Sequence, residues 1–416
     1  HQTLDARLQL DESAEVDHRG HDALADLARL QVGEEVLALL ALGLMKNDAV
    51  VGDLFTMLEE GRVKKGDDEL SDNELPWVVQ ALGRIGRPGL DKAGEETVVV
   101  DAMIKLLDKK KGKGSTNVRR SAAIALGQIA GQCEPKMQKK VISALRKAST
   151  DAKDASVANF AMISIGRIGS SDGIDDDTRG EVIDTLGYLM EKAKPSSIKQ
   201  PFAALSLGLI GRKMTNRKLV SEKISGPIRE KFKDESNPRS KGAYAVASGL
   251  VRDPLAVEAL VKTLTDKGAE KKLRGYCAIS LGMIQDPAGK TAITKVLEDN
   301  TDRELRVQTA IAAGLIGDAG VIDPLVDILQ KGDESQYILG SVALALGQIG
   351  DERAIEPLLN ISKDPEKKYP DLTRALATVA LGQIGDRRDV PVLSRVASDI
   401  NYRAHVAAMA ELLTIL

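Results

Sequence analysis

A glycine returns at intervals of about 30 to 45 residues along most of this chain, a period typical of repeat arrays. Ala or Ser stands two residues before each of these glycines, and an apolar residue, usually Ile, stands two residues after it. These ten repeat glycines are Gly43, Gly83, Gly127, Gly166, Gly208, Gly249, Gly282, Gly314, Gly347 and Gly382. Three linked columns predict one array of similar units rather than separate globular domains.

Each unit is predicted to consist of two helices joined by a turn, as residues 351–385 illustrate. The first part, ERAIEPLLNIS, places apolar residues such as Ile355 and Leu358 on one stripe. The turn KDPEKKYPD follows, and LTRALATVALGQIG then forms a second helix that contains the repeat glycine. Aromatic residues make up only 3% of the chain, which disfavours a β-sandwich or barrel. The sequence therefore predicts an all-α fold.

The repeat glycine is interpreted as a packing device. An interior glycine destabilises a helix by about 0.5–1 kcal/mol relative to Ala, and close approach of two helices would offset this loss. A phosphate-binding loop would need a strand before the glycine and a helix after it, and that context is absent from the pattern. We expect Gly347→Leu to overpack the contact, and Gly347→Ala to be tolerated better or even to stabilise if the site has room.

The segment DERAIEPLLNISKDPEKKYPDLTRALATVALGQIGD resembles the HEAT repeat, in the short variety named after phycobilisome lyases. The resemblance implies a superhelical α-solenoid of about ten to eleven helix pairs, with the second helices lining the concave side. It divides the chain into a polar, poorly patterned segment (1–30), longer repeats (31–252) and regular repeats with a C-terminal cap (253–416). All three are expected to form one continuous solenoid.

A basic column lies eight residues before the repeat glycine, early in the predicted second helix. Six units carry a cation there: Arg119, Lys241, Arg274, Arg306, Arg374 and Arg403. Stacked units would align these side chains. Two interpretations are open: a structural ladder with acidic residues of neighbouring units, or a cationic surface that binds a partner.

Charge is also unevenly distributed along the chain. Residues 105–250 contain 28 Lys and Arg against 15 Asp and Glu, whereas residues 1–104 contain 10 against 22. This basic middle is typical either of solvated loops or of a surface for an acidic partner, which could be a protein or a nucleic acid. Few aromatic residues lie among the lysines, so stacking of single-stranded bases has little support. The candidate binding residues are Lys109, Lys110, Lys111, Lys113, Arg212, Lys213, Arg217 and Lys218, together with Arg119, Lys241, Arg274 and Arg306.

No catalytic or metal-binding arrangement is evident in the sequence. The four histidines are His1, His18, His21 and His405, and none forms the His-Glu pair with which the HEAT-like deoxyhypusine hydroxylases bind iron. Cys133 and Cys277 are expected to be free, buried thiols, because they lie more than three units apart. We therefore expect neither a cofactor nor a metal.

These observations favour a non-catalytic scaffold or adaptor that binds another macromolecule along the solenoid surface. A protein partner, acidic in character, is the first expectation, and nucleic acid is the weaker one. The alternative is a HEAT-like enzyme or accessory lyase that acts on a nucleic acid or a chromophore. No apolar run reaches the roughly 20 residues of a membrane span, and a cytoplasmic location is expected. The chain begins with His1 rather than Met, so an exported, processed protein stays an alternative.

Reversal of Lys109, Lys110 and Lys111 to Glu is expected to weaken capture of an acidic partner and to reduce its salt dependence. The reason is that exposed charges act only within about 8 Å at physiological salt. Binding measured at several salt concentrations checks this. Unchanged capture with unchanged salt dependence would show that these lysines are only a solvated loop.

Overall fold

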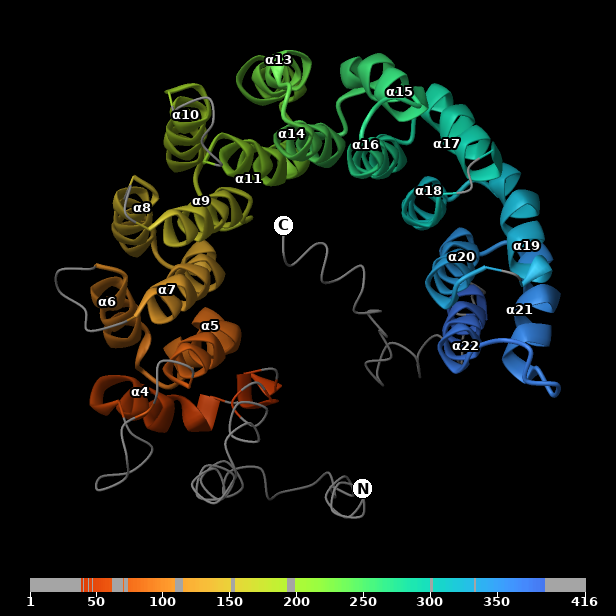
Figure 1. Cartoon of the computed structure of the whole chain (residues 1–416). Coiled ribbons are helices and arrows are strands. Elements are labelled where there is room, and N and C mark those ends of the chain that lie inside the picture. Colours follow the sequence, from red (N-terminus) through yellow and green to blue (C-terminus); the bar gives the residue numbers. More distant parts are fainter. Residues whose placement is uncertain are drawn as a thin grey trace. The chain divides into compact units, whose positions relative to one another are not determined.

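The structure is a computed structural model that describes residues 39, 41–43, 45–46, 48–61, 70, 74–108, 115–150, 154–192, 199–299, 302–332 and 334–385. Across these residues it contains nineteen α-helices, α4 to α22, and no strand (Figure 1). The prediction of an all-α solenoid is therefore confirmed. The predicted polar segment 1–30 and the C-terminal cap after Gly385 lie outside the described residues.

The chain divides into two compact units, one up to Thr185 and one from Leu186. This division falls inside the longer repeats, so the predicted boundary between residues 252 and 253 stays a prediction. The helices of the first unit are α4 (Val51–Glu60), α5 (Leu75–Lys92), α6 (Glu96–Leu107), α7 (Thr116–Ile129), α8 (Pro135–Ser149), α9 (Ala155–Gly169) and most of α10 (Asp176–Lys192).

The second unit continues the pattern of paired helices. A short π-helical segment, Ser221–Ser225, joins its second and third helices. Its helices are α11 (Lys199–Lys213), α12 (Arg217–Val220), α13 (Gly226–Asp234), α14 (Pro238–Val251), α15 (Val257–Thr265), α16 (Lys271–Ile284), α17 (Pro287–Asp299), α18 (Arg303–Ile316), α19 (Ile322–Lys331), α20 (Gln336–Ile349), α21 (Ile355–Lys363) and α22 (Asp371–Gly385).

The second helices of successive repeats pack directly on one another. In the first unit this row is α5, α7 and α9, and in the second unit it is α11, α14, α16, α18, α20 and α22. Within the second unit, α15, α17, α19 and α21 lie together along one side of that row (Figure 1). Each second helix therefore has one side against its own first helix, two sides against neighbouring second helices, and one side that forms a surface, called here the second-helix face.

The repeat glycines lie where successive second helices touch. A Cβ built on Gly347 would be 2.7 Å from Ala380 Cα, and one built on Gly249 would be 2.7 Å from Ser280 Cα. The same close contact with the Ala or Ser of the next repeat is made by six further repeat glycines: Gly43, Gly83, Gly127, Gly208, Gly282 and Gly314. Two of the three sequence columns are thus the two halves of one interhelical contact, and the packing interpretation of the glycine is confirmed.

Local signals end and restart the helices between units. Gly317 and Gly350 have left-handed φ angles of 67° and 73° and terminate α18 and α20, as helix C-caps favour glycine. The aspartates that follow the second helices, Asp253, Asp318 and Asp351, then accept a hydrogen bond from the backbone N–H two residues on. This capping begins the next first helix, so the chain reverses direction at a fixed point in each of these units.

Cys133 and Cys277 are both buried and both free, as expected from the sequence. Burial raises the pKa of the Cys277 thiol to about 12. It also raises the pKa of Cys133, where Glu96 adds to the effect through a hydrogen bond and its charge. Both thiols therefore stay protonated at neutral pH, which makes them poor nucleophiles.

The contact at Gly347 corrects the expectation that alanine could stabilise this site. The site has no room for a Cβ, which would also lie 2.9 Å from the Cβ of Ala380. Gly347→Ala is therefore expected to lower the free energy of unfolding by about 1–3 kcal/mol, and Gly347→Leu to lower it more. Urea unfolding checks both variants. The control is Gly180→Ala in α10, where no described atom lies within 4 Å of the new Cβ, and a gain of about 0.5–1 kcal/mol is expected. Equal tolerance at the two positions would contradict the close-contact role.

Candidate binding face

The predicted basic residues are divided among several environments. Lys109, Lys110, Lys111 and Lys113 lie outside the described residues. Arg212 and Lys213 are exposed at the end of α11, and Lys218 is exposed in α12. Arg217 is also exposed, but its guanidinium donates to the backbone carbonyls of Gly211 at 3.3 Å and Val251 at 2.8 Å. Arg217 thus binds the C-terminal ends of two second helices, which leave carbonyls without helical partners.

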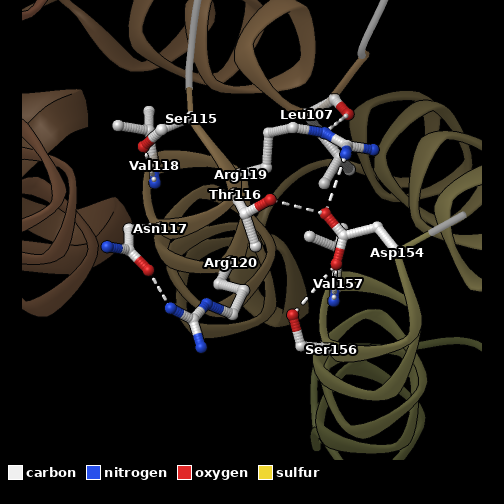
Figure 2. Close-up of polar contacts among 10 residues, drawn as sticks. All are labelled: Leu107, Ser115, Thr116, Asn117, Val118, Arg119, Arg120, Asp154, Ser156 and Val157. Carbon is white, nitrogen blue, oxygen red and sulfur yellow. Dashed lines mark hydrogen bonds and ion pairs between the residues drawn. The ribbon is translucent and has the colours of Figure 1, made fainter. Parts of the chain in front are cut away.

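Two arginines of the basic column make an equivalent internal contact. Arg119 is 4% exposed, and its Nε donates to the Leu107 carbonyl at 3.2 Å (Figure 2). Arg274 is 8% exposed, and its Nε donates to the Leu264 carbonyl at 2.8 Å. Leu107 and Leu264 lie in the last turn of the first helix of the same repeat. These two arginines therefore satisfy the free carbonyls at the end of the first helix.

The cluster around Asp154 ties α7 to the start of α9. Asp154 accepts hydrogen bonds from the Val157 N–H at 3.2 Å, Ser156 Oγ at 2.9 Å and Thr116 Oγ1 at 3.0 Å (Figure 2). It also forms an ion pair of 3.1 Å with Arg119. The carboxylate therefore caps α9 and fixes the second helix of the preceding repeat at the same time.

The second unit repeats this arrangement between neighbouring repeats. Lys271 in α16 lies 2.5 Å from Asp302, the N-cap of α18, and its hydrogen bond holds the pKa of that carboxyl below its usual value. Arg306 in α18 pairs with Glu334, which directly precedes the N-cap of α20. The Arg306 contact matches the structural ladder that the basic column allowed, and Lys271, which lies outside the column, adds an equivalent contact.

The remaining members of the column have local partners or are not described. The Lys241 ammonium lies 5.1 Å from the centre of the Phe232 ring, and Arg374 pairs with Asp371 three residues earlier at 3.2 Å. Arg403 lies outside the described residues. A role of the column in binding a partner stays a prediction.

Grouping the charged residues by helix shows a pattern that the counts over long ranges of the sequence do not show. Six second helices, α7, α9, α11, α14, α16 and α20, contain no Asp or Glu within their bounds. Acidic residues do occur in the first helices α6, α10, α13, α15, α17, α19 and α21. The signal was present in the sequence, because the repeat glycine identifies each second helix. The second-helix face is consequently poor in negative charge.

A hollow of about 550 Å³ lies on the second-helix face of the second unit, across α11, α14, α16 and α18. We call it the apolar trough. Its lining is mainly apolar and includes Leu205, Val246, Leu250, Ile279, Met283, Ile311 and Leu315. These residues stand either three before or one after the repeat glycine. Successive repeats therefore build the trough from the same two positions.

The charged residues that line the apolar trough are mostly basic. Arg212, Arg239, Arg252 and Lys272 lie there, against the single acid Glu270. Within the described part of the chain, none of the four cations forms an ion pair with a protein carboxylate. Of the residues predicted from sequence to bind, only Arg212 lines this hollow. The trough thus combines an apolar floor with unpaired positive charge.

The described ranges contain neither a metal-binding cluster nor a membrane-spanning helix. No group of three or more His, Cys, Asp or Glu side chains there is placed to hold a metal ion. No helix in those ranges has both the length and the apolar character that crossing a membrane requires.

The Asp154 cluster generates a stability prediction. Burial alone would raise the pKa of Asp154, but the hydrogen bonds from Val157, Ser156 and Thr116 and the charge of Arg119 outweigh it and lower the pKa below 3.8. Asp154→Ala is expected to lower the free energy of unfolding at neutral pH by about 3 kcal/mol, since the buried Arg119 loses its ion pair with this carboxylate.

The pH dependence of stability distinguishes the contribution of the Asp154 charge from that of the side chain's shape. A carboxyl whose pKa is lowered by folding contributes its full stabilisation of the folded protein at pH values above its unfolded-state pKa of 3.8. That contribution is lost as the pH falls through the pKa of the carboxyl in the folded protein. Asp154→Asn should therefore destabilise at neutral pH, and the difference from the parent protein should shrink as the pH falls below about 4. Thermal melts measure this, with the exposed Asp176→Asn as control. A difference that is constant with pH would contradict the ionic role.

Comparison with known proteins agrees with this architecture. Residues 257–339, 291–370 and 332–411 match the family described as HEAT repeats. No curated protein sequence matches the chain. Among solved structures, importin beta is 11% identical with a TM-score of 0.53, over 89% of this chain and 55% of that chain.

Two further structures show more distant likeness. Kap121p bound to Nup53p is 12% identical with a TM-score of 0.49, over 87% of this chain and 39% of that chain. Human deoxyhypusine hydroxylase is 17% identical with a TM-score of 0.30, over 71% of this chain and 99% of that chain. At these identities the likeness concerns the fold alone. This chain contains HEAT repeats between residues 257 and 411, in an all-helical solenoid.

Proposed function

We propose that this protein is a non-catalytic adaptor that binds an acidic protein segment along its second-helix face. The observation that carries the proposal is the apolar trough, in which partly exposed apolar side chains lie beside four cations that form no ion pair within the described residues. The HEAT-like repeats are proposed to be of the short phycobilisome-lyase type. The basic residues predicted from the sequence, Arg212 first among them, are proposed to contribute to the same binding.

The apolar floor supplies the attraction for hydrophobic anchors. Ile279 and Met283 in α16 and Ile311 and Leu315 in α18 are each partly exposed, although two neighbouring helices present them side by side. Covering such side chains contributes roughly 25 cal/mol per Å² of apolar surface removed from water. An amphipathic helix with anchors at every third or fourth position suits a hollow of this kind.

The basic residues at the apolar trough favour a partner segment with negative charge. Helices α11, α14 and α16 contain no acid, so a basic segment would meet only repulsion from them. An acidic segment would be steered toward the trough and would pair with Arg212, Arg239 or Lys272. This argument supports an acidic partner and a faster encounter at low salt.

The enzymatic alternative receives less support from the same geometry. A catalytic pocket needs a few convergent polar groups in an enclosed site. The apolar trough is open and mainly aliphatic, and its charged residues stand at different repeats. Nucleic acid is distinguished by its salt dependence, because neutralising several phosphates makes the affinity fall steeply with salt.

Fluorescence polarisation with a synthetic helical peptide tests the proposal. The probe carries Leu at three positions spaced three or four residues apart and Glu at the exposed positions, and its matched control replaces every Glu by Lys. The Glu peptide is expected to bind and the Lys peptide to bind at least about tenfold more weakly. Met283→Glu should reduce binding of the Glu peptide by a similar factor.

A control variant and a second substitution keep this test interpretable. Leu359→Glu alters a 38% exposed apolar residue on the first helix α21 and should leave binding unchanged. Lys272→Glu changes only an exposed charge at the trough, so it avoids any packing defect at Met283. Equal binding by all three variants, each shown to be folded by circular dichroism, would contradict the trough as the binding site.

A further inference from the structure

The position one residue after the repeat glycine differs in character along the chain. In the second unit it holds Leu209, Leu250, Met283 and Leu315, three of which line the apolar trough, and then Gln348 and Gln383. In the first unit the same position holds Arg84 in α5, Gln128 in α7 and Arg167 in α9. We call these three residues the donor cluster. Because α5 packs on α7 and α7 on α9, they form a row along one face.

Gln128 presents its amide donors to this row. Its Oε1 is buried and lies over Gly83, because a Cβ built on that glycine would be only 2.6 Å from the oxygen. The amide carbonyl is therefore turned toward α5. No hydrogen bond to another described residue is formed by Nε2, so its two N–H groups are left for another acceptor.

Neither arginine of the donor cluster has an anionic partner among the described residues. The Nε of Arg84 is buried without a hydrogen bond. Helices α7 and α9 contain no acid, and the one acid within α5 is Asp91, seven residues after Arg84 and near the helix end. This sets the cluster apart from Arg119, which has both a carbonyl and a carboxylate to bind.

The two guanidinium groups lie close enough to repel. Arg167 is exposed to solvent on one side, but protein surrounds it on others, and this partial burial lowers its pKa. The positive charge of Arg84 lowers that pKa further. Two like charges on one row of helices, with no acid in α7 or α9 between them, are stabilised by any anion that bridges them.

We propose that Arg84, Gln128 and Arg167 form a site for a carboxylate side chain of an acidic protein segment. The two guanidinium groups and the Gln128 amide N–H groups donate hydrogen bonds, and the one acceptor of the cluster, Gln128 Oε1, is buried against Gly83, which fits an oxyanion. Ile124 and Ile163, each three residues before a repeat glycine, are partly exposed beside the cluster's helices. They give aliphatic contacts that a protein segment can use and a phosphate backbone cannot. The site belongs to the first unit, so it does not depend on the apolar trough.

Binding of a fluorescent Glu-rich peptide to the full chain tests this site. Arg84→Gln combined with Arg167→Gln is expected to weaken binding at least about tenfold, because charge-assisted hydrogen bonds are lost. The matched control, Lys136→Gln combined with Arg146→Gln, removes two exposed charges from the first helix α8 and should change binding less than about twofold. Equal loss in both double variants would overturn the proposal, since it would show only general electrostatic attraction.

Gln128→Glu gives a second readout that a structural role would not produce. The new carboxylate would pair with both arginines and occupy the site from within. Peptide binding should fall at least about tenfold, while the melting temperature at neutral pH should rise, and that rise should disappear as the pH falls below about 4. A lower melting temperature with unchanged peptide binding would overturn the proposal.

The same assay distinguishes the donor cluster from the apolar trough, and a carboxylate ligand from a phosphate ligand. Met283→Glu should leave the contribution of the donor cluster intact, because that residue lies in the other unit. A phosphoserine-containing peptide or a DNA duplex that binds more tightly than the Glu-rich peptide through Arg84 and Arg167 would overturn the choice of carboxylate.

Discussion

Successive second helices are held together by a contact between a backbone and a very small side chain. At Gly347 and Gly249 the next helix approaches so closely that a Cβ would lie 2.7 Å from its Cα. This approach sets the spacing between neighbouring repeats. The Arg119 contact with Asp154 and the rows of side chains on the second-helix face both depend on that spacing. A change of spacing would therefore alter the internal ladder and the binding face together.

The two kinds of helix differ in their acidic residues. Most first helices, with α8 as an exception, carry acids that solvent can surround, whereas six of the second helices contain no acid within their bounds. Two members of the basic column, Arg119 and Arg274, bind carbonyls inside the array, and Arg119 also binds the N-cap carboxylate of Asp154. Among the described residues, Arg84, Arg167 and the four cations of the apolar trough form no ion pair with a carboxylate. Net charge along the chain does not distinguish cations that have partners within the array from cations that do not.

The sequence predicted the helix pairs and the role of the glycine correctly, because both depend on local patterns that repeat. It could not decide between the two uses of the basic column, since an arginine such as Arg119 is long enough to reach either a carbonyl or a partner. It also misjudged Gly347→Ala, because a pattern identifies the neighbouring residue and not the distance to it. The apolar trough and the donor cluster could have been found by comparing the positions around each repeat glycine. The lysines at 109–113 stood out instead because they are consecutive, although they lie outside the described residues.

The left-handed glycines and the aspartates that follow them make the repeat a unit that can be removed whole. Deletion of residues 318–350 would join Gly317 to Asp351, which recreates the same helix end and the same cap. Gly314 would then face Ala380 in place of Ala345, with the same pairing of glycine and alanine. A deletion of only part of that segment would leave a glycine opposite a larger residue. Length variation in such a chain is therefore expected to occur in whole repeats, each of which shortens the binding face by one helix.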